Sequence, residues 1–290
     1  MTDAETTSGN GRFASHGILG KFGWALRSDP GEVREHNEDF AGAYAPTTPD
    51  DAWDRGPCFV LADGLGGHAA GEVASRIAVE TVLSRWSGPN PAPPVNALRS
   101  ALRAANEAVF DAALEHGHRG MGTTVVAATL AGKELVVAHV GDSRAYLVQG
   151  ERCTQLTTDH SRVAEMVRMK LITPEQAANH PARSMLPRSL GGEPAVQIDL
   201  GRQPVERGDV LVMCSDGLWD LVSRAELAEI AMAIGTNVAP TPTEAADHLI
   251  ELALKRGAPD NVTVVLVRVT SDLPIPAVAG RRVPFLRRNR

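Results

Sequence analysis

The chain has 290 residues, of which 43% are hydrophobic and 22% charged, and its formal net charge is −6. This length allows a sizeable hydrophobic core, and the composition excludes a largely disordered chain. The negative charge and the aromatic content of only 4% argue against a nucleic-acid-binding surface. Three scattered cysteines, Cys58, Cys153 and Cys214, do not form a disulfide framework and are typical of a reducing cytosol.

The two ends of the chain differ from its body. Residues 1–16 are small and polar and contain no apolar signal-peptide core, so we expect a disordered segment there. Residues 271–290 form a basic tail whose last ten residues include five arginines. This tail is either a solvated extension or a docking arm for an acidic partner or a membrane surface. No apolar run is long enough for a transmembrane segment, and we expect a cytoplasmic protein.

The body of the chain alternates short apolar runs with longer helical patterns. Strands are predicted at 58–62, 123–130, 134–140, 144–148, 210–215 and 262–269. Helices are predicted at 69–86, 95–116, 224–234 and 242–256, with Thr243 and Glu244 opening the last one. The strands between 123 and 148 are separated only by short turns, so they pair antiparallel. The pattern predicts an α+β fold in which helices are layered over antiparallel sheet.

The segment from Asp159 to Gly192 interrupts this alternation. It contains two short helical patterns and three prolines. A long, partly helical excursion from a sheet core is often a lid or a substrate-contacting flap. We therefore predict a flap over about 161–192.

Acidic residues recur in turns beside the apolar runs. Each such turn alone is common, because Asp-Gly and Asp-Asn favour turns. Five of them in one domain suggest that carboxylates converge at one edge of the core, where a cation must neutralise them. Ligation by oxygen alone suits Mg²⁺ or Mn²⁺, and zinc-type spacing of His and Cys is absent from the sequence. The five turns are Asn37-Glu38-Asp39, Asp63-Gly64, Gly141-Asp142-Ser143, Ser215-Asp216-Gly217 and Asp260-Asn261.

The stretch VLADGLGGHAAGE at 60–72 allows a second interpretation. Gly64-x-Gly66-x-x-Ala69 matches a dinucleotide-binding fingerprint between a strand and a helix. However, the negative charge of Asp63 opposes a pyrophosphate at that turn, and the antiparallel meander that follows contradicts the βαβ order. We therefore favour the metal-binding interpretation.

Six motifs in order resemble the bacterial branch of the metal-dependent type 2C Ser/Thr protein phosphatases: VLADGLGGHAAGEVAS, GMGTTVV, VAHVGDSRAYLV, LTTDHS, MCSDGLWD and GAPDNVTVV. The resemblance covers about residues 17–270, which we take as the phosphatase domain. It implies a four-layer αββα sandwich, with two central antiparallel sheets flanked by helices. It also implies two Mn²⁺ or Mg²⁺ ions, with a possible third, weaker site.

The resemblance assigns roles to individual residues. Asp63 would bridge both metals, with the carbonyl of Gly64 on the second, while Asp216 and Asp260 would complete the shell of the first. Glu38 would hold metal-bound water and Asp39 would support the cluster. Asp142 would hold the third metal together with Asp216.

Substrate contact and proton transfer are less completely assigned. Arg34, four residues before Glu38, matches the arginine that grips the substrate phosphate, and a bidentate guanidinium suits that task. Leu65 occupies the position where eukaryotic relatives carry a candidate general-acid histidine, so the acid is unassigned. We favour structural roles, such as bonding a backbone carbonyl, for His68 and His160.

Several other residues receive structural interpretations. Met166, Met169 and Leu171 are interpreted as packing within the flap, and Leu218 and Trp219 as core. Asn106 and Glu107 are interpreted as the polar face of their helix. Thr123 and Thr124 are expected to begin a strand, with hydrogen bonding to a ligand carboxylate as the alternative.

The resemblance thus implies a metal-dependent phosphoprotein phosphatase that hydrolyses phosphoserine and phosphothreonine through a metal-bridging water or hydroxide. The expected partners are phosphorylated proteins, including a bacterial Ser/Thr kinase and its substrates, and we expect a monomer that binds no nucleic acid. Two alternatives remain open: a catalytically silent phosphoprotein-binding module, and a phosphoesterase that acts on small molecules or nucleotides.

Overall fold

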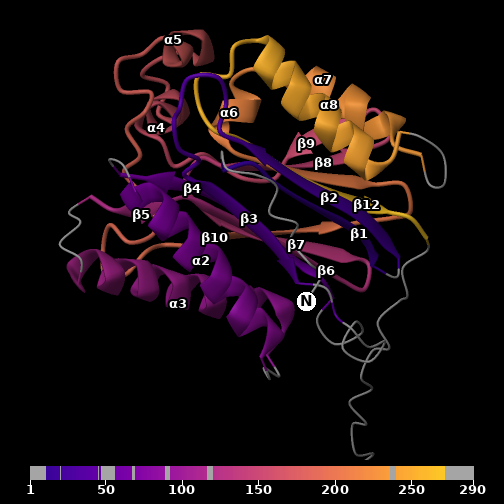
Figure 1. Ribbon diagram of the computed structural model, residues 1–290, viewed down its shortest axis with the longest axis horizontal. Coiled ribbons are helices and arrows are strands. Elements are labelled where there is room, and N and C mark those ends of the chain that lie inside the picture. The colour runs from indigo at the N-terminus through magenta and orange to yellow at the C-terminus, as the bar shows by residue number, and fades with distance from the viewer. Residues whose placement is uncertain are drawn as a thin grey trace, which may run out of the picture.

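Two antiparallel sheets form the centre of the molecule in the computed structural model (Figure 1). The structure describes residues 11–19, 21–44, 46, 56–66, 69–88, 92–115, 120–235 and 240–271. The first sheet has the strand order β1-β2-β12-β11-β8-β9, and the second has the order β10-β7-β6-β4-β3, with the short β5 paired to β4. Every pairing is antiparallel, as predicted for the meander.

Strands alternate with small groups of helices along the chain. The strands are β1 (Phe13–Leu19), β2 (Phe22–Asp29), β3 (Asp39–Tyr44), β4 (Cys58–Leu65), β5 (Gly122–Thr123), β6 (Val125–Ala131), β7 (Glu134–Val140), β8 (Arg144–Gln149), β9 (Arg152–Gln155), β10 (Asp199–Pro204), β11 (Val210–Cys214) and β12 (Val262–Val269). The helices are α2 (Ala69–Ser87), α3 (Pro94–Glu115), α4 (Arg162–Arg168), α5 (Pro174–Ala178), α6 (Asp216–Trp219), α7 (Arg224–Ala233) and α8 (Pro242–Lys255).

Helices cover the outer face of each sheet, so the predicted four-layer αββα sandwich is confirmed. Helices α2 and α3 pack on the second sheet, where Val79 and Trp86 are buried in one apolar cluster with Val60. Helices α6, α7 and α8 pack on the first sheet around a second cluster. A third cluster fills the space between the sheets and includes Phe59. Figure 1 shows α2 and α3 on one side of the sheets and α7 and α8 on the other.

Strand β4 shows why the central strands read as unbroken apolar runs. Cys58, Val60 and Ala62 belong to the cluster beneath α2, whereas Phe59 and Leu61 belong to the cluster between the sheets. Successive side chains of a strand point to opposite faces, and here both faces are buried. A strand covered on both sides therefore lacks the alternation of apolar and polar residues that a one-sided sheet shows.

One predicted boundary and one predicted helix cap differ from the structure. Residues 13–16, which we expected in a disordered segment, lie in β1, because this strand pairs along its length with β2. Residues 1–10 and 272–290 lie outside the described residues, so the expectations for the rest of that segment and for nearly all of the tail remain untested. The predicted start of α8 at residue 242 is confirmed, but Thr241 rather than Thr243 opens the helix, because Thr241 caps it in a capping box with Glu244.

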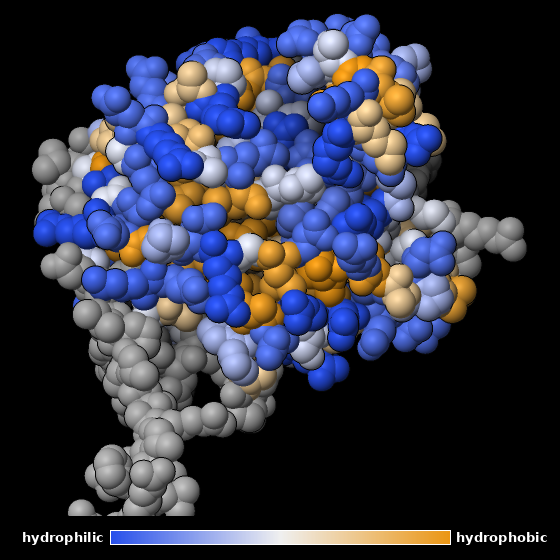
Figure 2. All heavy atoms as spheres, turned by 180° about the vertical axis from the view of Figure 1, so that it is seen from behind, coloured by the Kyte–Doolittle hydropathy of each residue, from blue (hydrophilic) through white to orange (hydrophobic). Residues whose placement is uncertain are grey.

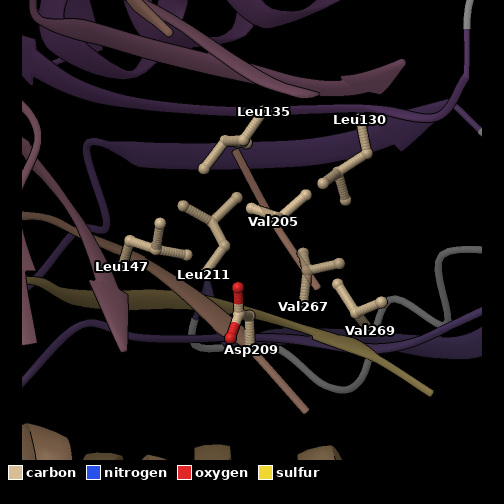
Figure 3. Close-up of a pocket in the computed structure, with 8 residues that line it drawn as sticks. All are labelled: Leu130, Leu135, Leu147, Val205, Asp209, Leu211, Val267 and Val269. Carbon is tan, nitrogen blue, oxygen red and sulfur yellow. The ribbon is translucent and has the colours of Figure 1, made fainter. Parts of the chain in front are cut away.

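The two ends of the sandwich differ in character. At the end where β11 begins and β12 finishes, branched aliphatic side chains surround a small gap between the sheets (Figure 3). The gap leaves no room for a water molecule, and the nearby carboxylate of Asp209 accepts hydrogen bonds from Gln149 and from the backbone of Glu206. Among the described residues that line it, this gap therefore has no space for a ligand. The opposite end gathers the acidic turns.

Candidate metal centre

Strand ends from both sheets bring the predicted carboxylates together. Asp39 begins β3 and lies opposite Asp63 of β4 in the second sheet. Asp216 follows β11, and Asp260 precedes β12, which is paired with β11 in the first sheet. The side chains of Asp63 and Asp216 lie within hydrogen-bonding reach, and Asp216 interacts electrostatically with Asp260. The structure thus places these four carboxylates at one end of the sandwich.

Burial and mutual repulsion perturb this cluster strongly. Burial raises the pKa of Asp63 well above its usual value, and the charges of Asp39, Asp216 and Asp142 raise it further. Burial likewise raises the pKa of Asp39 to about 7, even though hydroxyl donors oppose the shift. The pKa of Asp216 rises to about 6 because it is desolvated and lies near Asp260. Such groups ionise together at neutral pH only when a cation offsets their charge.

The donor set fits hard divalent cations. Carboxylate oxygens dominate the cluster, and β4 and α2 approach so closely that a Cβ on Gly64 would lie 2.2 Å from the carbonyl oxygen of Gly71. A residue with a side chain would therefore push the backbone at Gly64 away from its neighbours. Mn²⁺ and Mg²⁺ prefer oxygen ligands of this kind. The chain's own residues that would hold the ions are Asp63, Asp216, Asp260 and the carbonyl of Gly64.

Glu38 and Arg34 flank the cluster from the loop before β3. Burial raises the pKa of the Glu38 carboxyl, while the nearby Arg34 opposes that shift. The Arg34 guanidinium, half exposed, donates a 2.7 Å hydrogen bond to Asp260. The predicted phosphate-gripping residue thus lies directly beside a predicted metal ligand. That position is consistent with a group that contacts both the acidic centre and an incoming anion.

Asp142 approaches from the turn after β7. Burial raises its pKa to about 7, with the charge of Asp216 as the next contribution. Its carbonyl accepts a 3.1 Å hydrogen bond from the indole Nε1 of Trp219, and the Arg144 guanidinium stacks 3.5 Å above that indole ring. Leu218 is fully buried, as predicted for a core residue. Trp219 is only partly buried and holds the Asp142 turn in place.

Several polar side chains that position the ligands were not predicted from the sequence. Ser215 donates a 2.7 Å hydrogen bond to Asp39. Asn261 accepts a 2.8 Å bond from the backbone of Glu38 and donates to the carbonyls of Pro30 and His36. These residues adjoin the predicted turns, and adjacency in the sequence was the only signal that could have found them. Their role is to fix the loop that carries Glu38 and Asp39.

The threonine pair after Met121 supports the backbone of Asp63. Thr123 donates from its hydroxyl to the carbonyl of Asp63 at 2.8 Å, and the hydroxyl of Thr124 accepts from the Asp63 N–H at 3.0 Å. Thr123 belongs to the two-residue β5, while β6 begins just after Thr124. Both hydroxyls therefore contact the backbone of the ligand rather than its carboxylate.

Asn106 contradicts its predicted place on a polar helix face. It is 1% exposed, its side-chain amide donates to the carbonyls of Glu193 and Pro194, and its side-chain oxygen accepts from the backbone of Gly191. The carboxyl end of the flap lies over α3 at this point and buries the amide. Asn106 therefore anchors the flap.

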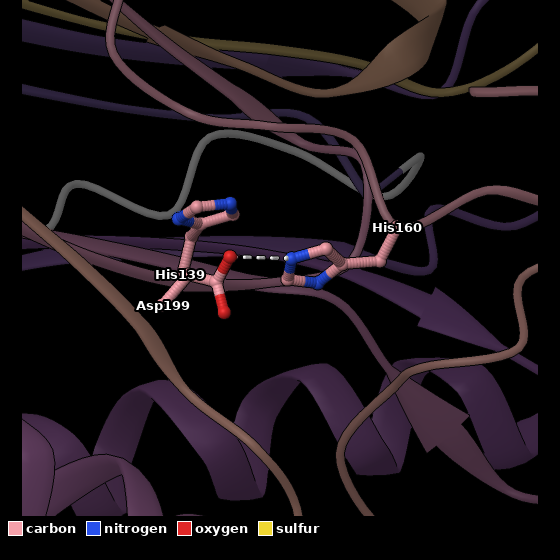
Figure 4. Close-up of side chains that lie close together, drawn as sticks. All are labelled: His139, His160 and Asp199. Carbon is pink, nitrogen blue, oxygen red and sulfur yellow. Dashed lines mark ion pairs between the residues drawn. The ribbon is translucent and has the colours of Figure 1, made fainter. Parts of the chain in front are cut away.

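Two histidines form a separate cluster with Asp199 (Figure 4). The ring Nδ1 of His160 accepts a 3.0 Å bond from the backbone N–H of Gly141, so the neutral ring carries its proton on Nε2, which faces Asp199 at 3.3 Å. Burial, with His139 and Arg188 nearby, lowers the pKa of His160 to about 4. Arg188 Nη1 donates to Asp199 at 3.0 Å and also lies 2.9 Å from His160 Nε2, which carries a proton in this tautomer and therefore does not accept from the guanidinium.

These contacts make the histidine cluster structural. A metal on His160 Nε2 would require the ring proton to sit on Nδ1, where it would face the N–H of Gly141. The carboxylate of Asp199 already pairs with the Arg188 guanidinium, so it is not free to bind a metal. The prediction of a structural role for His160 is confirmed, although its ring accepts from a backbone N–H rather than bonding a carbonyl. His68 lies outside the described residues.

Comparisons with known proteins match this architecture. The sequence pattern of the protein phosphatase 2C family matches residues 43–252. The serine/threonine phosphatase Stp of Listeria innocua is 39% identical over 83% of this chain and 94% of its own length. The serine/threonine protein phosphatase PstP of Mycobacterium tuberculosis is 42% identical over 85% of this chain and 45% of its own length.

A solved structure agrees with the same assignment. The catalytic domain of PstP in complex with two manganese ions superposes with a TM-score of 0.72 at 37% identity, covering 86% of this chain and 99% of that one. The fold and its acidic end define a metal-dependent phosphatase scaffold. The chain belongs to the protein phosphatase 2C family, which confirms the resemblance inferred from its motifs.

Proposed function

We propose that this chain is a Mn²⁺- or Mg²⁺-dependent protein phosphatase that hydrolyses phosphoserine and phosphothreonine. The observation that carries the proposal is the convergence of Asp39, Asp63, Asp216 and Asp260 from both sheets at one end of the sandwich. Relatives named serine/threonine phosphatases and the manganese-bound PstP structure support the substrate class and the metal.

The residues of the candidate metal centre would have different roles. Asp63, Asp216, Asp260 and the carbonyl of Gly64 would hold the cations, while Asp39 and Glu38 would support them. When bound, divalent cations neutralise charge on the phosphoryl oxygens and lower the pKa of water. Arg34 would add a guanidinium fork to the phosphate oxygens. Asp142, held by Trp219, would share a third cation with Asp216.

The finer expectations belong to the same proposal. The partners would be phosphorylated proteins, including a Ser/Thr kinase that this enzyme opposes, and the enzyme would act as a monomer. None of the described helices is long and apolar enough to cross a bilayer. The cytoplasmic location remains a prediction, which fractionation of cells that express the full chain would test.

Hydrolysis assays test the proposal directly. The full chain should hydrolyse p-nitrophenyl phosphate and phosphothreonine peptides with Mn²⁺, and EDTA should abolish both activities. Nucleotides should be poor substrates. Asp63→Asn and Asp216→Asn should each lower kcat/KM by about 100-fold or more, because ligand loss exceeds the effect of losing a supporting contact. Peptide binding without metal-dependent turnover would instead support the silent binding module.

A further inference from the structure

We propose that Val33, together with Glu32 and Glu35 in the loop between β2 and β3, contacts the residues beside the phosphorylated side chain of a substrate. These three residues, called here the loop triplet, would favour phosphosites flanked by apolar and basic residues and disfavour acidic ones. The inference rests on the proposed function and assigns a substrate class to it.

The start of this loop is fixed against the turn before β12. A Cβ on Gly31, which has a φ of +80°, would lie 2.3 Å from the carbonyl oxygen of Asp260. The N–H of Glu32 donates a 2.9 Å hydrogen bond to the carbonyl of Ala258. Glycine allows both this backbone conformation and this close approach, whereas a side chain would clash. The backbone of the loop triplet is therefore held beside a predicted metal ligand.

The end of the loop is held by Asn261. Its side-chain amide donates to the carbonyls of Pro30 and His36, both at 2.9 Å, and its side-chain oxygen accepts from the backbone of Glu38. Figure 1 shows the loop in indigo at the same end of the sandwich as α6. Because the backbone is already fixed, a ligand that binds here has to order little more than side chains.

Between these anchors the side chains face the solvent. Residues 32–36 are all exposed, and Val33 is 67% exposed. Exposure of an apolar side chain does not by itself mark a site. Met169 and Leu171 are 60% and 66% exposed, contrary to their predicted packing within the flap. Figure 2 also shows orange residues among blue ones over the back of the molecule. The position of Val33 is what distinguishes it.

Val33 directly precedes the residue that is predicted to grip the phosphate. The Arg34 guanidinium donates a 2.7 Å hydrogen bond to Asp260 and also lies within electrostatic range of Glu38 and Asp216. Consecutive Cα atoms of a chain are about 3.8 Å apart. A phosphate bound by Arg34 therefore brings the neighbouring residues of the substrate within reach of Val33.

Charge determines which neighbouring residues the loop accepts. Arg34 is paired with Asp260, whereas the carboxylates of Glu32 and Glu35 have no hydrogen bond or ion pair within the described part of the chain. These two carboxylates stand on both sides of Arg34 in the sequence. They attract lysine and arginine side chains of a substrate and repel aspartate and glutamate. The loop triplet is therefore complementary to a segment with apolar and basic residues beside the phosphosite.

A substrate segment fits the loop triplet better than a permanent partner does. One exposed valine offers far less apolar area than the roughly 800 Å² that each partner buries in a stable interface. Two copies of the chain that met through this loop would bring the unpaired carboxylates of Glu32 and Glu35 together, and like charges oppose association. A transient contact beside a bound phosphate needs no large area, so we assign a phosphoprotein segment as the occupant.

Steady-state kinetics of the full chain with Mn²⁺ provide the test. The substrates are p-nitrophenyl phosphate, which has no flanking residues, and four phosphothreonine peptides. The peptides differ only in the two residues beside the phosphothreonine, which are both Leu, both Ser, both Lys or both Glu. The variants are Val33→Ser and the double Glu32→Gln/Glu35→Gln.

Matched controls lie at the opposite end of the sandwich. Ile18→Ser replaces another exposed apolar side chain, near the end of β1. Glu151→Gln/Glu206→Gln removes the same amount of charge from two exposed turn residues. The controls therefore separate an effect of position from an effect of composition.

The expected results separate the apolar and charged contributions. Val33→Ser should reduce the preference in kcat/KM for the Leu peptide over the Ser peptide by about 3- to 5-fold, as the loss of one apolar contact predicts. The double glutamate variant should reduce the preference for the Lys peptide over the Glu peptide by about 3- to 10-fold, within the range of two exposed ion pairs. Added salt should reduce that same preference in the unmodified chain.

Hydrolysis of p-nitrophenyl phosphate should not change in any variant, and the controls should behave as the unmodified chain. Three outcomes would overturn the assignment: an unchanged Leu preference in Val33→Ser, an unchanged Lys preference in the double glutamate variant, or an equal loss with p-nitrophenyl phosphate. If the unmodified chain hydrolyses no phosphoester with Mn²⁺, the proposed function itself fails, so the two failures are distinguishable.

Discussion

Ser215 donates a hydrogen bond of 2.7 Å to the carboxylate of Asp39 and thereby joins the two sheets at the acidic end. Ser215 follows β11 of the first sheet, whereas Asp39 begins β3 of the second. The same hydroxyl accepts from the backbone N–H of Thr263 at 3.0 Å. One fully buried side chain thus sets the distance between the carboxylates that the two sheets contribute.

Ser215→Ala should weaken metal binding without unfolding the chain. Removing the donor leaves the buried Asp39 carboxylate less well oriented, and losses of such supporting contacts reduce metal affinity by about 10- to 100-fold. Calorimetric titration with Mn²⁺ measures this effect. Ser75→Ala removes another buried hydroxyl, one that bonds only within α2, and should leave the affinity unchanged. Equal affinity in the two variants would contradict the role of Ser215.

Metal-free protein should lose stability as the pH rises from about 4 to about 7. In the folded chain the pKa is about 7 for Asp39 and Asp142 and about 6 for Asp216, against an unfolded value near 4. Between these values the folded state binds more protons than the unfolded state, so the free energy of unfolding falls with rising pH. His160 has the opposite effect, because burial lowers its pKa from 6.5 to about 4. Between pH 4 and pH 6.5 this histidine binds fewer protons in the folded state than in the unfolded state, so its contribution to the free energy of unfolding rises with pH.

Thermal unfolding with and without Mn²⁺ at pH 5.5 and 7.5 checks this prediction. The metal should raise Tm more at pH 7.5, because protons no longer compete for the carboxylates. Asp142→Asn removes one of the titrating groups and should flatten the pH dependence of the metal-free protein. If Mn²⁺ raises Tm equally at both pH values, the proposed coupling between protonation and metal binding is wrong.

Lys170→Gly should stabilise the flap. Glycine adopts the left-handed conformation at φ of +58° without the strain that a side chain causes. The greater freedom of glycine in the unfolded chain offsets part of this gain. We therefore expect the free energy of unfolding to rise by roughly 0.5–1 kcal/mol. Lys170→Ala removes the same charge but retains the strain and serves as the matched control. Urea unfolding, combined with hydrogen exchange of the Leu171 amide, measures the difference. If Lys170→Ala stabilised the protein as much as Lys170→Gly, the charge of Lys170 rather than its backbone strain would be what lowers the free energy of unfolding.

Asn106→Ala should loosen the carboxyl end of the flap. The change leaves the N–H of Gly191 and the carbonyls of Glu193 and Pro194 without their side-chain partner, at a cost of about 1–3 kcal/mol. Asn106→Asp retains an acceptor for Gly191 and should be less damaging for that amide. Hydrogen exchange at Gly191 should therefore be fastest in the alanine variant. Equal protection of Gly191 in all three proteins would exclude an anchoring role.

The central strands were predictable because burial on both faces produces apolar runs, as in Val262–Val269. Strand β2 was missed although most of it is buried, because Ser28 and Asp29 read as turn residues. The hydroxyl of Ser28 is satisfied by Thr263 at 2.7 Å, a partner 235 positions away. The edge strands β1, β3, β9 and β10 were all missed because their residues are mostly exposed or only partly buried.

The carboxylates of the candidate site were predictable, whereas their supports were not. In the sequence, Asp63 and Asp216 follow apolar runs, which is a local pattern. The predicted turn at Asp63-Gly64 is wrong, because β4 continues through both residues to Leu65, with Asp63 paired to Asp39 and Gly64 to Thr123. Asn106 looks like any polar residue on a helix surface until the flap covers it. Its burial depends on tertiary structure, so no window of sequence around it contains the signal.

The position of β12 has a consequence for how the protein is made. This strand lies between β2 and β11, so the middle of the first sheet is completed only by residues 262–269. A growing chain cannot close that sheet until these residues have left the ribosome. Incomplete chains that end before β12 should therefore have no phosphatase activity. Phosphoproteins near the ribosome are exposed to the active enzyme only after this strand has been synthesised.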